Sequence, residues 1–122
     1  MTKPYDLEER TFQFAKEVRV FIKTLEKTIT NNEDAKQVIQ APGPIGSNYI
    51  EANESLSKKD FIMRIKICRK EAKESRFWLK LLDIDSNDRI NENRLALIQE
   101  ATELMKIFAS ILSKSEGKQV GK

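Results

Sequence analysis

The sequence predicts an all-α fold: an antiparallel four-helix bundle whose second helix is kinked at Pro42-Gly43-Pro44. Four segments repeat apolar residues at alternating steps of three and four, which places those side chains on one side of an α-helix. The chain has only four glycines and three prolines, too few for a sheet protein with many tight turns. Because short polar connections join the segments, neighbouring helices are expected to run antiparallel.

The first helix is expected to begin after Asp6, whose side chain can cap its first turn, and to end near Lys27. Its apolar stripe provides the four-three spacing of a helix that buries one face. The stripe comprises Leu7, Thr11, Phe14, Val18, Phe21 and Leu25, widened by Phe12, Ala15 and Ile22.

The second helix is expected to open at residues 32–34 and to be interrupted at Pro42-Gly43-Pro44, because two prolines remove two backbone donors. A continuation is expected over residues 45–55. Glycine at 43 and 46 allows another backbone to approach closely. The kink is therefore interpreted either as a helix crossing or as a hinge or binding loop.

The third helix is expected over residues 57–82, opened by Ser57 with Asp60 in the pattern of a capping box. This segment carries nine basic and three acidic residues, a net charge of +6, whereas the whole chain carries +3. Such asymmetry favours a polyanionic partner or an acidic surface on a neighbouring subunit. Its apolar stripe comprises Phe61, Ile65, Cys68, Ala72, Ser75, Leu79 and Leu82.

A polar turn over residues 83–88 should lead into the fourth helix. Ile90, Leu97, Leu104 and Ile111 recur there every seven residues. Ile98, Ala101, Met105, Phe108 and Leu112 broaden that face. Residues 1–122 are expected to form a single domain, in which the aperiodic tail 113–122 is frayed.

The composition argues against an enzyme. With no histidine in the chain, histidine triads and histidine metal sites are excluded. Cys68, the single cysteine, lies on the predicted core stripe and is interpreted as a packing residue. No glycine-rich phosphate loop is present, and no cofactor or metal is expected. The lone cysteine, the absence of an apolar leader and the lack of long apolar runs indicate a cytoplasmic protein.

Basic residues collect on one flank of the third helix, and we call this set the basic flank. It is the candidate nucleic-acid-binding site, because cations on a rigid helix neutralise phosphates and release counterions. The alternative is a solvated face, or a surface paired with acidic residues on adjacent helices. Phe77 lies near this flank, where it would stack on a base or seal a subunit contact, and Trp78 lies toward the acidic side. The basic flank comprises Lys59, Lys66, Arg69, Lys70, Lys73, Arg76 and Lys80.

Four runs together resemble a known family: residues 5–11 (YDLEERT), 46–52 (GSNYIEA), 57–61 (SKKDF) and 67–79 (ICRKEAKESRFWL). They are similar to the bacterial four-helix-bundle proteins, also called ribosomal-RNA intervening-sequence proteins. The resemblance is close over the first three helices and extends to the fourth only by pattern. It implies an up-and-down four-helix bundle that assembles as a ring-like homopentamer.

The resemblance also implies binding to structured RNA or the ribosome, and some relatives are accessory proteins of a reverse transcriptase. Gln40 and Pro44 replace an arginine and a serine common in the family, so a phosphate contact from the kink is not carried over. The family has no agreed catalytic residues. The first hypothesis is a non-enzymatic, homo-oligomeric, ribosome-associated RNA-binding bundle. The alternatives are a protein-interaction scaffold and an accessory subunit of a reverse transcriptase.

Overall fold

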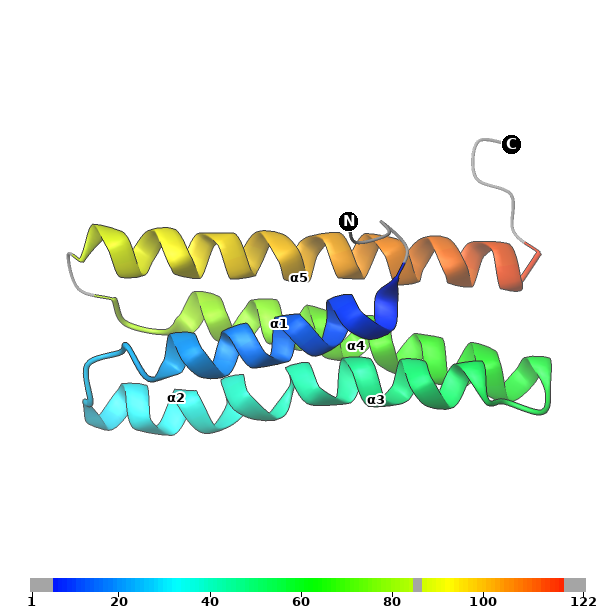
Figure 1. Cartoon of the computed structure of the whole chain (residues 1–122), viewed down its shortest axis with the longest axis horizontal. Coiled ribbons are helices and arrows are strands. Elements are labelled where there is room, and N and C mark those ends of the chain that lie inside the picture. Colours follow the sequence, from blue (N-terminus) through cyan, green and yellow to red (C-terminus); the bar gives the residue numbers. More distant parts are fainter. Residues whose placement is uncertain (1–5, 85–86, 118–122) are drawn as a thin grey trace.

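The computed structural model describes residues 6–84 and 87–117. These residues form an antiparallel four-helix bundle, which confirms the predicted fold class (Figure 1). α2 and α3 follow one another end to end and make up one kinked arm of the bundle. The helical segments are α1 (Leu7–Ile22), α2 (Ile29–Gln40), α3 (Pro42–Asn53), α4 (Lys58–Leu81) and α5 (Asp88–Ser115).

The kink of the second arm lies at Ala41, directly before the Pro-Gly-Pro run. Ala41 keeps right-handed helical angles (φ −77°, ψ −40°), and its N–H donates to Gln37 O at 3.3 Å. Pro42 and Pro44 both fall in the first turn of α3, where a missing N–H removes no intrahelical bond. The continuation therefore begins at Pro42 and not at Ile45 as the sequence pattern predicts.

Two helix boundaries differ from the prediction because threonines set them. α1 ends at Ile22 and not near Lys27, since the N–H and hydroxyl of Thr24 both donate to Phe21 O, at 2.9 and 2.7 Å, and close a turn. α2 begins before residues 32–34, because Thr28 Oγ1 accepts from Asn31 N at 3.1 Å and caps the helix.

The C-terminal helix is longer than predicted. α5 continues through Ser115, so the first residues of the tail 113–122 are helical. Residues 118–122 lie outside the described residues. Asn87 caps the other end of α5 by accepting from Ile90 N at 3.0 Å.

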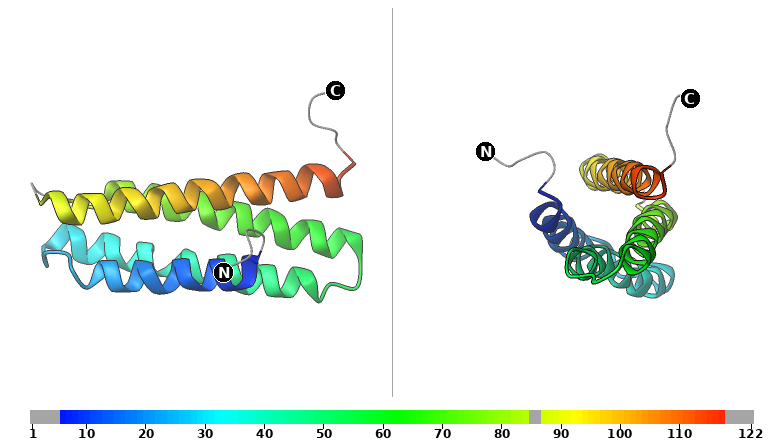
Figure 2. Two further views of the ribbon diagram at one scale, coloured as in Figure 1. Left: turned by 45° about the horizontal axis from the view of Figure 1, so that its top comes forward. Right: turned by 90° about the vertical axis from the view of Figure 1, so that its right-hand side faces the viewer.

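The predicted apolar stripes pack together and form the core. The end view in Figure 2 shows how the helices lie around the bundle axis. One predicted core position is wrong. Phe12 is 56% exposed on the outer face of α1, where Lys16 Nζ lies 5.8 Å from its ring centroid. The largest fully buried side chains include Phe14, Val18, Val38, Ile45, Ile65, Leu79, Leu104 and Phe108.

α1 and α3 cross closely at Gly46. A Cβ added to Gly46 would lie 2.9 Å from Thr11 Oγ1, whereas one added to Gly43 would meet no atom of another helix within 4 Å. Thr11 is fully buried at this crossing. The close approach predicted for the two glycines is therefore confirmed at Gly46 and is absent at Gly43.

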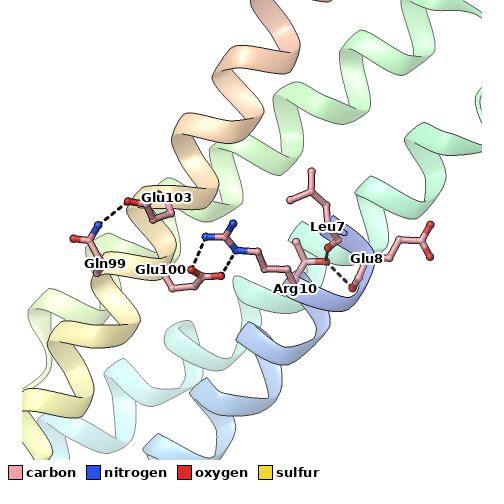
Figure 3. Close-up of polar contacts among 7 residues, drawn as sticks. Leu7, Glu8, Arg10, Gln99, Glu100 and Glu103 are labelled. Atoms are coloured by element: carbon pink, nitrogen blue, oxygen red, sulfur yellow. Dashed lines mark hydrogen bonds and ion pairs between the residues drawn. The ribbon is translucent and has the colours of Figure 1, made fainter. Parts of the chain in front are cut away.

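An ion pair links α1 to α5. Arg10 Nε and Nη2 donate to Glu100 Oε2 and Oε1 at 2.7 and 2.9 Å (Figure 3). The two side chains are 26% and 27% exposed. The hydrogen bond to Glu100 raises the pKa of Arg10, and the nearby Glu103 carboxylate adds to this effect. This bidentate contact fixes how α1 lies against α5.

Candidate nucleic-acid interface

α4 divides into a buried stripe and an exposed basic flank, as the sequence predicts. Ser57 caps the helix by accepting from Asp60 N at 3.1 Å. The stripe residues Ile65, Cys68, Ala72, Ser75 and Leu79 are all fully buried. Their burial fixes the rotation of α4 about its axis, and this rotation turns the basic residues outward.

All seven residues of the basic flank therefore lie on one rigid helix. Arg76 is half-buried and the other six are exposed. At 1.5 Å per residue, Lys59 and Lys80 are about 32 Å apart along the axis. The flank is a long strip and not a compact cluster.

The middle of the flank borders a groove between α4 and α5. Arg69, Lys70 and Lys73 line it from α4, together with Lys106 from α5. Met105 and Ala109, both half-buried, complete the lining. The volume is about 540 Å³. We call this feature the α4/α5 groove.

The structure thus brings together three of the seven predicted residues and adds one that sequence reasoning missed. Lys106 is exposed and directly follows Met105, a residue of the predicted apolar face. That position marks the edge of the face. Lys106 can be assigned to the site only when the antiparallel alignment of α4 with α5 is known. The sequence around Lys106 does not show this alignment.

A second hollow of about 500 Å³ lies near the N-terminal end of α4. Lys59 and Lys66 border it, together with Lys58 and the apolar side chains of Ile62 and Met63. The two parts of the flank therefore differ in surroundings. The middle borders α5 along the groove, whereas the N-terminal end lies close to the turn between α3 and α4.

Ion pairs distinguish the cations further. Lys66 Nζ lies 3.5 Å from Glu116 Oε2 on the residue that follows α5, and Lys70 Nζ lies 4.0 Å from Glu74 Oε2. Within residues 6–84 and 87–117, no ion pair involves Arg69, Lys73 or Lys106. Among the cations that line the α4/α5 groove, these three are therefore the ones most available to an anionic ligand.

The aromatic pair beside the flank is divided between surface and core. Phe77 is 57% exposed, whereas Trp78 is half-buried and packs against the core cluster. Their ring centroids are 5.1 Å apart with an interplanar angle of 83°. The edge contact with Trp78 restrains the exposed Phe77 ring.

The acidic side of α4 is less hydrated than the basic flank. Desolvation raises the pKa of Glu71, and repulsion from Glu74 raises it further, while Lys70 opposes the shift. On the same side of the helix, Arg64 Nη1 donates to Asn48 Oδ1 of α3 at 2.9 Å. This side of α4 is thus the one that packs toward α3.

Cys68 has the environment of a packing residue. It is fully buried, and its Sγ donates to Ile45 O at 3.4 Å. Burial raises the pKa of this thiol to about 12, so the nucleophilic thiolate is scarce at neutral pH. In the described part of the chain, no three His, Cys, Asp or Glu side chains are grouped so that they could hold a metal ion. None of the described helices is long and apolar enough to cross a membrane.

No protein-family model matches this sequence, and no curated protein sequence is similar to it. A solved structure is similar. It is the crystal structure, at 1.70 Å, of a protein of unknown function from the S23 ribosomal protein family of Bacteroides thetaiotaomicron. The two chains are 26% identical, with a TM-score of 0.69, over 86% of this chain and 96% of that one.

Proposed function

We propose that the protein is a non-enzymatic, homo-oligomeric helical bundle that binds structured RNA through the basic flank of α4. The single observation that carries this proposal is the convergence of Arg69, Lys70, Lys73 and Lys106 on one groove. The similarity to a member of the S23 ribosomal protein family supports ribosomal RNA, or RNA on the ribosome, as the partner. The resemblance to intervening-sequence proteins points the same way.

Phosphate neutralisation explains how such a surface would bind. Each lysine or arginine that contacts a phosphate releases condensed counterions, so affinity falls steeply with salt. The core holds the backbone of α4 in place, because the opposite face of the helix is buried. Little backbone ordering therefore accompanies binding.

The test is fluorescence anisotropy with a labelled ribosomal-RNA fragment at several salt concentrations. The test variant is K66E/R69E/K73E, and we expect it to abolish binding without unfolding the bundle. In the single variants K66E, R69E and K73E, the slope of log affinity against log salt concentration should be lower than in the wild type, and the decrease would count the phosphates contacted.

α1 provides a matched control. K16E/R19E/K23E changes the same residue types at the same spacing, and all three side chains are exposed. α1 lies on the other side of the bundle from α4 (Figure 2). Unchanged RNA binding by the α4 variant, or equal loss in both triple variants, would remove the assignment to the basic flank.

Assembly as a homopentamer is the second part of the proposal. The resemblance to ring-forming relatives supports it, and so do exposed apolar side chains such as Leu56 (99% exposed) and Met63 (53% exposed). Multi-angle light scattering is expected to give the mass of five chains at micromolar concentration. A monomer under those conditions would reject it.

A protein-interaction scaffold is the competing function, and the Lys66–Glu116 pair favours it because that cation is already engaged by a carboxylate. In this case K66E/R69E/K73E would lose oligomeric mass or partner binding while the wild type shows no affinity for RNA. An accessory subunit of a reverse transcriptase would combine both activities. A reverse transcriptase gene next to the gene of this protein would support this third function.

A further inference from the structure

An exposed phenylalanine follows the cations of the α4/α5 groove along the same helix. We propose that the groove binds an unpaired segment of the RNA, with a phosphate between Arg69, Lys73 and Lys106 and a base stacked on Phe77. This inference rests on the proposed RNA-binding function and names the form of RNA that enters the site.

The groove combines charge with an apolar lining. Its cations come from two helices, and its remaining lining residues are the side chains of Met105 and Ala109. A phosphate alone would use only the cations. A nucleotide also presents a sugar and an aromatic base, which match the apolar part. The volume of about 540 Å³ falls in the range of small-molecule pockets, roughly 300–1,000 Å³.

Phe77 lies four residues after Lys73, one helical turn and about 6 Å along the axis. It is off the buried stripe of α4, and more than half of its surface is in water, 57%. The core does not require an aromatic side chain at this position. Aromatic rings on a basic surface are the stacking platforms that single-stranded nucleic acids use.

A paired segment does not fit this arrangement. In an A-form helix the bases are stacked on one another, and the deep major groove is closed to side chains. Only unpaired bases in loops, bulges and ends are free to stack on a protein ring. The combination of groove and exposed ring therefore favours an unpaired segment over a duplex.

The inference is tested by anisotropy with three labelled RNAs: a short single strand, a blunt duplex of the same sequence, and that duplex with an unpaired bulge. Wild-type protein should bind the single strand and the bulge about tenfold more tightly than the blunt duplex. F77L should weaken binding of the single strand about tenfold and leave duplex binding unchanged. K106E should weaken all three.

Two control variants match these changes. F12L alters an equally exposed phenylalanine, 56% against 57%, which also has a lysine close by, and K114E alters another exposed lysine of α5. Both should bind like wild type. Trp78 is the only tryptophan of the chain and touches Phe77, so its fluorescence should change when the single strand binds and not when the blunt duplex does.

The outcomes separate the two proposals. Equal binding of single strand and duplex, or wild-type affinity of F77L for the single strand, would overturn the inference while RNA binding by the basic flank stands. Wild-type protein that binds none of these RNAs and no ribosomal-RNA fragment would overturn the proposed function itself. In that case an acidic protein would be the remaining occupant of the groove.

Discussion

Replacing Gly46 with alanine should destabilise the bundle, although alanine is the better helix former. The added methyl carbon would lie 2.9 Å from Thr11 Oγ1 and 3.4 Å from Thr11 Cβ. The hydroxyl cannot turn away freely, because it donates to Leu7 O at 2.6 Å and lies 3.2 Å from Glu8 O. One of the two helices must therefore shift.

The magnitude follows from two opposing contributions. Glycine to alanine in a helix stabilises by up to about 1 kcal/mol. Overpacking a closely packed site costs about 1–3 kcal/mol. We expect Gly46→Ala to lower the free energy of unfolding by about 1 kcal/mol, measured by urea denaturation followed by circular dichroism, with an unchanged m-value.

Gly43→Ala is the control in the same helix, since apart from its chain neighbours and its own helix nothing lies within 4 Å of an added Cβ there. Because Gly43 precedes Pro44, the added Cβ offsets part of the helix-forming gain of alanine, and the variant should be nearly neutral. Thr11→Ala removes the obstructing hydroxyl. The double variant Thr11→Ala/Gly46→Ala should therefore lose about 1 kcal/mol less unfolding free energy than the two single variants lose together. If Gly46→Ala matches Gly43→Ala, or if the cycle is additive, the close crossing is refuted.

Three further changes test other parts of the structure. Arg10→Ala should lower the free energy of unfolding by about 1–2 kcal/mol, because it leaves the partly buried Glu100 carboxylate unpaired. Glu100→Gln should lower it less, and equal losses in the two variants would contradict this reasoning. The Cys68 thiol should resist a disulfide reagent at about pH 8 until the protein unfolds, and reaction at the rate of a free thiol would show that it is accessible. The raised pKa of Glu71 means that the folded state holds this proton more tightly, so the contribution of Glu71 to stability should fall as pH rises from the ordinary value of 4.5 through the raised pKa. Glu71→Gln should lessen that fall in denaturation series at increasing pH, and identical pH profiles would exclude the effect.

The core could be predicted from the sequence because a buried helical face leaves a periodic record. On α4, five predicted stripe residues are fully buried, and Phe61 is half-buried at the first turn. Helix ends were predicted less well, since single side-chain bonds decide them. Thr24 and Thr28 end α1 and start α2 by hydrogen bonds that many polar residues in that connection could have made.

Phe12 shows a second limit of the pattern. A large apolar residue next to a stripe looks like core, yet here it lies on the surface beside Lys16. The basic flank was predictable as a set, because all its members lie on one helix. Which of its charges remain unpaired was not, because Glu116 reaches Lys66 from the far end of the chain. Lys106 could not be assigned to the site from the sequence either, because it lies on α5 and reaches the groove only through the packing of α5 against α4.

The two hypotheses for the basic flank now concern different parts of α4. The end with Lys66 combines an existing ion pair with the exposed apolar side chains of Met63 and Leu56, which are features of a contact between protein surfaces. The middle combines Arg69 and Lys73, both without a described ionic partner, with a cation from α5. Unpaired charges that share a groove repel one another, which costs stability in the free protein. An anion that enters the groove relieves this repulsion. RNA binding at the middle and assembly at the end are therefore compatible uses of one helix.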